Sequence, residues 1–170
     1  MAHGLRLGDP AQPHGLRTLA KPWVAAVDAF AIGGGAQILL VCDHVIAAAD
    51  SFFALPAAQE GIVPGVANLR LPRLAGGRLA RQVILSGRRL WASDPLSACV
   101  FDEVVEPPAM DAAISARLEQ FAAPAVGVNR RMIGLCEEPL DTLRAYLAQF
   151  AIEQAQRLYS PDVLDKVKLA

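Results

Sequence analysis

The chain has 170 residues and a formal charge of −1, from sixteen Lys and Arg against seventeen Asp and Glu. Hydrophobic residues make up 54% of the sequence and charged residues 19%, a composition that forms a packed core and excludes a disordered protein. Because the charges balance, no long-range field attracts nucleic acid or an anionic membrane, and neither is expected as a partner.

Several other classes of protein are excluded by short motifs that the sequence lacks. The longest clearly apolar stretch covers residues 38–42, far short of the roughly 20 residues that span a bilayer. No secretory signal is recognisable in residues 1–20, so we expect a cytoplasmic protein. Cys42, Cys99 and Cys136 have no metal-ligand spacing and predict reduced, mostly buried thiols. With no HExxH, P-loop or GxGxxG sequence either, we expect no metal, ATP or dinucleotide site.

The first third of the chain predicts strands and one helix around a run of glycines. Residues 1–20 are rich in Gly, Pro and His and predict an irregular lead-in. Apolar runs then predict strands and a helix in this order: strand 22–28, glycines 33–35, helix 36–42, strand 44–48 and strand 52–55. Such an alternation is typical of an α/β fold.

The remainder of the chain predicts mostly helices. Residues 56–65 hold two prolines and two glycines and are expected to be irregular. A helix should begin at Val66 and end at Gly87, followed by a short strand over 102–105. Two more helices are predicted by apolar residues at helical spacing, which are Met110, Ile114, Leu118 and Phe121, and, after Pro139, Leu143, Leu147, Phe150 and Gln154. No repeat or linker divides the chain.

The segment from Lys21 to Gln37 is the most informative part of the sequence. Its three glycines, Gly33, Gly34 and Gly35, stand between a predicted strand and a predicted helix. They let a ligand approach the backbone closely, and they leave unpaired N–H groups at a positive helix end. This is what an oxyanion hole requires to stabilise charge on a carbonyl oxygen. A tight turn that binds no ligand is the alternative.

Five blocks of sequence resemble the crotonase (enoyl-CoA hydratase/isomerase) family in order and spacing. They are KPWVAAVDAFAIGGGAQ, CDHVIAAADSFFALP, EGIVPGVANLRLPRLAGG, LSGRRLWASDPL and DEVVEP. The resemblance implies a crotonase-like ββα spiral with C-terminal helices, truncated at its N-terminus. It divides the chain into the lead-in 1–20, spiral core 21–108 and helical region 109–170. It also implies that acyl-CoA thioesters bind here and that the Gly34 N–H, flanked by Gly33 and Gly35, stabilises their enolate.

Two positions depart from the hydratases of that family. Those enzymes use two Glu side chains as acid and base, and the resemblance places them at Gln37 and Ala57 in this chain. An amide cannot exchange a proton near neutral pH, and a methyl group has none to exchange. Glu60 is the nearest carboxylate in sequence, and we expect it to be solvated or structural.

The departures are similar to those in the cofactor-independent dioxygenase branch of the family, through LPAAQEGIVPGVANLRL, GRRLWA, AYLAQFA and QAQRLY. That branch acts on 3,5-dihydroxyphenylacetyl-CoA in the pathway to dihydroxyphenylglycine, an antibiotic building block. The resemblance implies O2 as co-substrate, no cofactor and an arylglyoxylate product. Ala57 and Ile62 would line a dry pocket for O2, and Gln37 would hydrogen-bond the thioester or a peroxide. Plain core packing is the alternative for Ala57 and Ile62.

Residues 1–20 resemble nothing in the N-terminal half of the family, which supplies a second oxyanion donor and much of the CoA site. We therefore expect a C-terminal half that is nearly inactive alone. It would pair with a missing N-terminal half or form a homo-oligomer, a trimer or hexamer. The alternatives are an enoyl-CoA hydratase/isomerase-like protein and a non-catalytic remnant or interaction subunit.

Overall fold

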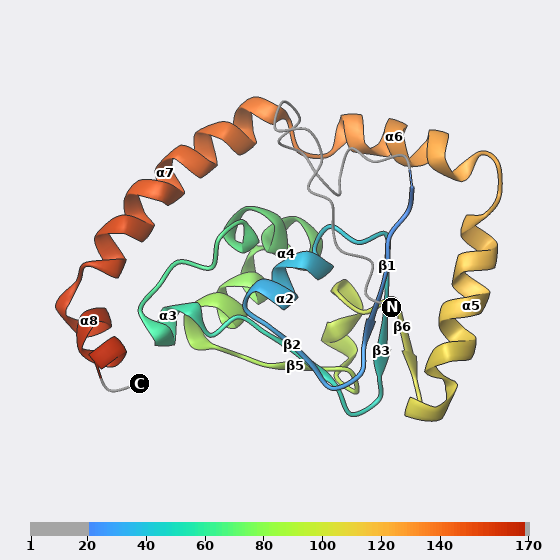
Figure 1. The fold of residues 1–170 in the computed structure, drawn as a ribbon, viewed down its shortest axis with the longest axis horizontal. Coiled ribbons are helices and arrows are strands. Elements are labelled where there is room, and N and C mark those ends of the chain that lie inside the picture. The colour runs from blue at the N-terminus through green and yellow to red at the C-terminus, as the bar shows by residue number, and fades with distance from the viewer. Residues whose placement is uncertain (1–20, 169–170) are drawn as a thin grey trace.

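The computed structural model describes residues 21–168, with the side chain of residue 167 left out. The predicted lead-in over residues 1–20 lies outside the described residues. Figure 1 shows a sheet-containing body with helices against it, partly surrounded by an arc of helices from the second half of the chain.

The body holds two three-stranded sheets, and the chain passes between them several times. The first has the order β1-β3-β6 with all strands parallel, and the second has the order β2-β4-β5, in which β4 and β5 are antiparallel. The strands are β1 Val24–Val27, β2 Phe30–Ile32, β3 His44–Ala48, β4 Phe52–Ala54, β5 Leu90–Trp91 and β6 Glu103–Val105. Because β1 and β2 each end a sheet, one edge of both sheets comes from the same early segment of the chain.

The helices divide into those that cover the body and those that form the arc. The first group consists of α2 Gly34–Leu39, α3 Ala57–Glu60 and α4 Ala67–Ser86. The arc consists of α5 Met110–Phe121, α6 Val126–Cys136, α7 Leu140–Leu158 and α8 Pro161–Lys168. Two short 3₁₀ turns, η1 Pro95–Cys99 and η2 Pro107–Ala109, complete the described part. Within that part, no helix has both the length and the apolar character needed to cross a membrane.

The main core lies between the sheets and the helices α2 and α4. Phe53, Leu55, Leu71, Leu90 and Val83 are among its fully buried side chains. A second, smaller cluster, made of Ile46, Ala48 and Met110, holds α5 against β3. The core therefore fixes α2, α4 and the strand ends, which are the elements that position the candidate site.

Several sequence predictions are confirmed, and others are wrong. The helix ending at Gly87 is present, and Gly87 takes a φ of 68° as its cap, although Gly76 kinks the helix. Residues 56–65 are not wholly irregular, because α3 fits between Pro56 and Gly61 and contains neither residue type. The short strands β2 and β5 and the helices α6 and α8 were not predicted, since their apolar patterns are too short or too interrupted.

The prediction that the three cysteines are mostly buried is also wrong. All three are free thiols, but Cys42 and Cys99 are only half-buried and Cys136 is exposed. Cys136 ends α6, which lies on the outside of the molecule. Burial raises the pKa of the Cys42 and Cys99 thiols, so neither is activated as a thiolate nucleophile.

Candidate active site

The glycine turn, Gly33–Gly35, joins β2 to α2. Gly33 precedes the helix with a φ of 56°, a conformation that L side chains rarely adopt, and its N–H donates to the carbonyl of Ala54 at 3.3 Å. Gly34 and Gly35 are exposed and begin the helix, and a Cβ added to either would meet nothing within 4 Å. Among the described residues, the Gly34 N–H has no main-chain partner, as expected of a first helical residue.

Gln37 lies one turn further along α2 and is half-buried. Its Oε1 accepts a hydrogen bond of 3.0 Å from the N–H of Val66, the residue directly before α4. Because a backbone N–H can only donate, the oxygen of the amide must face Val66 and its nitrogen must face elsewhere. Gly65 has a φ of 45°, and a side chain at this position would overlap the Gln37 amide.

Ala57 and Ile62 lie at the two ends of one short turn. Ala57 is buried and begins α3, whereas Ile62 is half-buried in the segment after the helix. The Ile62 N–H donates to the Ala57 carbonyl at 2.9 Å. Glu60, between them in sequence, is exposed. The side chains at the two ends of this turn are therefore apolar.

Two hydrogen bonds bring this turn and the glycine turn into one region. The Gly33–Ala54 bond anchors the start of α2 to the end of β4, shortly before Ala57. The Gln37–Val66 bond anchors the same helix to the residues shortly after Ile62. The structure thus gathers the six residues singled out in the sequence from two separate segments.

Three side chains of α7 reach the loop formed by residues 61–66, and of these only Gln154 belonged to the helical stripe predicted from the sequence. The Tyr146 hydroxyl donates to the Gly65 carbonyl. The Val63 N–H donates to Gln154 Oε1 at 2.8 Å, and Arg157 Nε donates to the Gly61 carbonyl at 2.6 Å. The contact face of α7 therefore includes Tyr146, Gln154 and Arg157, with Phe150 stacked on Tyr146, whereas the predicted member Leu147 is 40% exposed. Positions 146, 150, 154 and 157 follow helical spacing, which is the signal that could have identified this face.

The environment of Tyr146 keeps its hydroxyl protonated. Burial raises the pKa of this phenol above its usual range, and a hydrogen bond with the Asn68 side chain opposes the shift. The Tyr146 ring is also stacked on that of Phe150, with centroids 6.5 Å apart and planes inclined by 9°. The Tyr146 hydroxyl is thus a neutral hydrogen-bond donor, and its ring is fixed by stacking on Phe150.

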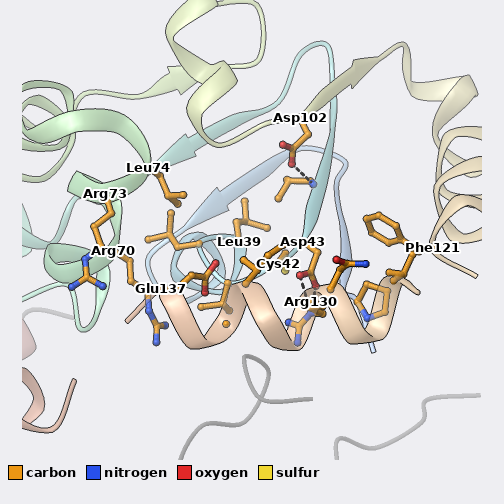
Figure 2. Close-up of a pocket in the computed structure, with 18 of the residues that line it drawn as sticks. Leu39, Cys42, Asp43, Arg70, Arg73, Leu74, Asp102, Phe121, Arg130 and Glu137 are labelled. Atoms are coloured by element: carbon orange, nitrogen blue, oxygen red, sulfur yellow. Dashed lines mark hydrogen bonds and ion pairs between the residues drawn. The ribbon is translucent and has the colours of Figure 1, made fainter. Parts of the chain in front are cut away.

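A large cavity of about 730 Å³ lies elsewhere, between α6 and the body of the molecule. Figure 2 shows Arg70 and Arg73 toward one end of it, Asp43 and Arg130 nearer its centre and Phe121 toward the other end. Two pairs of its charged groups are bonded to each other, since Arg70 Nε lies 3.1 Å from Glu138 and Arg130 Nε lies 2.7 Å from Asp43. None of the six candidate residues lines this cavity. The candidate site therefore lies at the glycine turn, where the Gly34 N–H has no main-chain partner among the described residues.

No group of three or more His, Cys, Asp or Glu side chains that could hold a metal ion is found in the described part of the chain. The polar groups at the glycine turn include the Gly34 N–H and the Gln37 amide. Such a pair of donors suits an oxygen-bearing ligand that develops negative charge.

Comparisons with known proteins agree with this reading of the fold. Residues 8–156 match the model of the enoyl-CoA hydratase/isomerase family. Over 151 residues the chain is 58% identical to a (3,5-dihydroxyphenyl)acetyl-CoA 1,2-dioxygenase of Amycolatopsis orientalis, covering 89% of this chain and 35% of that protein. It is 36% identical over 124 residues to a human peroxisomal bifunctional enzyme, covering 72% of this chain and 16% of that protein.

Solved structures show the same fold. The structure of an enoyl-CoA hydratase/isomerase from Pseudoalteromonas atlantica T6c aligns with a TM-score of 0.81 and 31% identity, covering 90% of this chain and 62% of that one. An enoyl-CoA hydratase from Mycobacterium avium subsp. paratuberculosis K-10 aligns with a TM-score of 0.79 and 28% identity, covering 88% and 61%. The chain thus spans about a third of the length of the dioxygenase, and less than two thirds of each of these structures.

Proposed function

Because this chain belongs to the enoyl-CoA hydratase/isomerase family, also called the crotonase family, we propose that its glycine turn binds the thioester carbonyl of an acyl-CoA. The Gly34 N–H would donate to the carbonyl oxygen and stabilise the enolate that forms when the α-proton leaves. Gly33 would hold the turn in its left-handed conformation, and Gly35 would keep the approach to the backbone open. Support comes from the exposed position of Gly34 and from the absence of a main-chain partner for its N–H in the described residues.

We further propose that the reaction is dioxygenation of 3,5-dihydroxyphenylacetyl-CoA without a metal or organic cofactor. The observation that carries this proposal is the chemistry of Gln37 and Ala57, neither of which can act as a general acid or base. Similarity to the Amycolatopsis dioxygenase supports dioxygenation over hydration. Hydratases require proton exchange at these positions, whereas a carbanion between a thioester and an aryl ring can pass an electron to O2 directly.

The proposed reaction balances without a further reactant. The α-proton is lost, O2 adds to the resulting carbanion, and the peroxide attacks the thioester carbonyl to expel CoA thiolate. Loss of the second α-proton with cleavage of the O–O bond then gives the arylglyoxylate, and the thiolate takes up one of the two released protons while the other passes to solvent. One arylacetyl-CoA and one O2 therefore yield one arylglyoxylate and one CoA. The proposed setting is the cytoplasm, and the proposed use of the product is the synthesis of dihydroxyphenylglycine.

Two apolar side chains provide the environment that O2 needs. Ala57 and Ile62 lie at the two ends of one turn and would line a dry pocket beside the enolate. A carboxylate at either position would admit water and protonate the carbanion. Gln37 would donate a hydrogen bond to the thioester or the peroxide without quenching either by proton transfer.

Catalysis would need more polypeptide than the described residues provide. A second oxyanion donor and most of the CoA site would lie in the part of the relatives' length that this chain does not span. Those groups would come from an N-terminal half, or from other copies in a homo-oligomer such as a trimer or hexamer. The exposed apolar side chains of α6 support self-association, and they include Met132, Ile133 and Leu135.

A chimera tests the proposed reaction. Residues 1–20 are replaced by the N-terminal half of a related dioxygenase, and O2 uptake is followed with dihydroxyphenylacetyl-CoA in an oxygen electrode. We expect uptake that a chelator does not inhibit and that Ile62→Glu abolishes while CoA binding persists. Ile62→Val is the matched control and should retain uptake. A folded chimera that binds CoA but takes up no O2 contradicts the proposed reaction and favours a non-catalytic role.

A further inference from the structure

A single peptide group between α2 and α7 is hydrogen-bonded at both of its ends to side chains. Its carbonyl belongs to Gly65 and accepts the hydroxyl of Tyr146, which lies on α7. Its N–H belongs to Val66 and donates to Oε1 of Gln37, which lies on α2, at 3.0 Å. Tyr146 and Gln37 are therefore connected through one peptide plane.

We propose that Tyr146 is the positioning residue of Gln37 and that the C-terminal helix α7 thereby sets which end of the Gln37 amide is available to a ligand. What Gln37 then does in catalysis rests on the function proposed above. The connection itself is a property of the folded chain and can be tested without any activity.

The physical basis is the rigidity of the peptide group. The peptide unit is planar, and in a trans peptide the C=O and N–H point in opposite directions. A hydrogen bond that fixes the carbonyl therefore also fixes the direction of the N–H. Hydrogen bonds that share such a group polarise one another, so the Tyr146 bond also makes the Val66 N–H a stronger donor.

Neighbouring contacts hold the segment that leads to this peptide. Gly65 supplies the left-handed turn, and its missing side chain leaves room for the Gln37 amide. Gln154 and Arg157 hold Val63 and Gly61 from the same face of α7. Of these three α7 contacts, the Tyr146 bond is the one made to the peptide that Gln37 also bonds.

As a consequence, the Gln37 amide offers hydrogen-bond donors at the site and not its acceptor oxygen. The Gln37 oxygen is occupied by Val66, and in the described residues Nε2 has no hydrogen-bond partner. Gln37 therefore offers donors, which suit the acceptor oxygens of a thioester, an enolate or a peroxide. A Gln37 amide that turned freely would also present its oxygen, which repels these groups.

The first test measures amide hydrogen exchange of Val66 by NMR in the full chain. Tyr146→Phe removes the hydroxyl and keeps the ring, and we expect Val66 exchange to become about three- to tenfold faster. Tyr159→Phe is the matched control, because Tyr159 ends the same helix and is 80% exposed, and it should change nothing. Unchanged Val66 exchange in a folded Tyr146→Phe variant overturns the proposal.

The second test keeps Tyr146 in place, so it does not depend on the folding of Tyr146→Phe. The chain has two tyrosines, so 3-fluorotyrosine in a Tyr159→Phe background gives one ¹⁹F signal, from position 146. We expect Gln37→Leu to shift this signal, whereas Gln59→Leu, at an exposed position of α3, leaves it unchanged. An unmoved signal in Gln37→Leu contradicts the connection.

The activity test uses the chimera described above. We expect Tyr146→Phe to lower kcat by about three- to tenfold with little change in KM, and to have no further effect in a Gln37→Leu background. An equal loss in both backgrounds shows that Tyr146 acts independently of Gln37 and overturns the proposal. A chimera without activity contradicts the proposed function alone, because the exchange and ¹⁹F results stand without it.

Discussion

Gly33 donates its N–H to the carbonyl of Ala54 at 3.3 Å, and this bond ties the glycine turn to the end of β4. Ala54 lies three residues before Ala57, so the bond sets the turn beside the segment that continues to Ile62. Gly33 takes a positive φ and Gly34 does not, so the two glycines have different roles in the same turn. Gly33 shapes the turn, and Gly34 presents an open N–H.

Substitution of the two glycines by alanine should separate these roles. Gly33→Ala forces a side chain into a positive φ and should lower the free energy of unfolding by about 1–2 kcal/mol. Gly34→Ala meets open space and should leave stability within about 0.5 kcal/mol of wild type. Urea unfolding measures both. In the chimera, Gly34→Ala should still lower kcat/KM at least about tenfold, because its methyl group occupies the approach to the N–H. Equal destabilisation by the two substitutions would contradict this division.

Water addition to crotonyl-CoA should be undetectable, both for the chain and for the chimera. Under the proposed function, Gln37 and Ala57 stand at the two positions where hydratases of the family carry their acid and base, and neither side chain exchanges a proton near neutral pH. Gln37→Glu alone should not restore the reaction, since the second carboxylate is still missing. A bacterial enoyl-CoA hydratase assayed in parallel is the positive control. Turnover comparable with that control would refute the argument from these two positions.

The isolated chain should self-associate through α6. Leu135 is 79% exposed, and Met132 and Ile133 are more than half exposed on the same helix. Burial of such side chains between copies releases about 25 cal/mol per Å² of apolar area. Light scattering should detect oligomers, and Leu135→Glu should increase the fraction of monomer. Gln156→Glu, at an exposed polar position of α7, is the control and should have no effect. A monodisperse monomer of the unmodified chain would falsify this prediction.

The ion pair between Arg70 and Glu138 should stabilise the attachment of the α6–α7 junction to α4. The Glu138 side chain is only 2% exposed and lies 3.1 Å from Arg70 Nε, with Arg73 further away at 3.6 Å. Arg70→Met leaves this buried carboxylate with a poorer partner and should cost about 2 kcal/mol of unfolding free energy. Arg73→Met removes a more exposed partner and should cost less than about 1 kcal/mol. The reverse order in thermal or urea unfolding would contradict the assignment.

Tyr146 should make stability depend on pH in the alkaline range. Its pKa is raised in the folded chain, mainly by burial, so folding favours the protonated phenol. The stability that it contributes is present below the pKa of an unfolded tyrosine and is lost as the pH rises through the higher folded value. Unfolding free energy should therefore fall more steeply above about pH 10 in wild type than in Tyr146→Phe. Tyr159→Phe should retain the wild-type slope. Parallel curves for wild type and Tyr146→Phe would show that the hydroxyl is not held as described.

The glycine turn could be predicted from the sequence because its physical causes are local. Three consecutive glycines between an apolar strand and an apolar helix require a turn with exposed N–H groups. The cap at Gly87 and the strand over residues 44–48 follow from equally local patterns, and both are present. Short elements such as α3 were missed because Pro56 and Gly61, which read as breakers in sequence, serve as its two caps.

The sequence by itself thus determined the α/β class and the glycine turn, whereas the replacement of both hydratase carboxylates stays a prediction. The tertiary structure alone decided that the Gln37 oxygen is bonded to Val66 and that Tyr146 holds the same peptide. The reason is physical. A hydrogen bond between α2 and the start of α4, or between that loop and α7, depends on how distant elements pack, and residue spacing along the chain does not encode that distance. The packing of α2, α4 and α7 therefore decides which end of the Gln37 amide is open to a ligand.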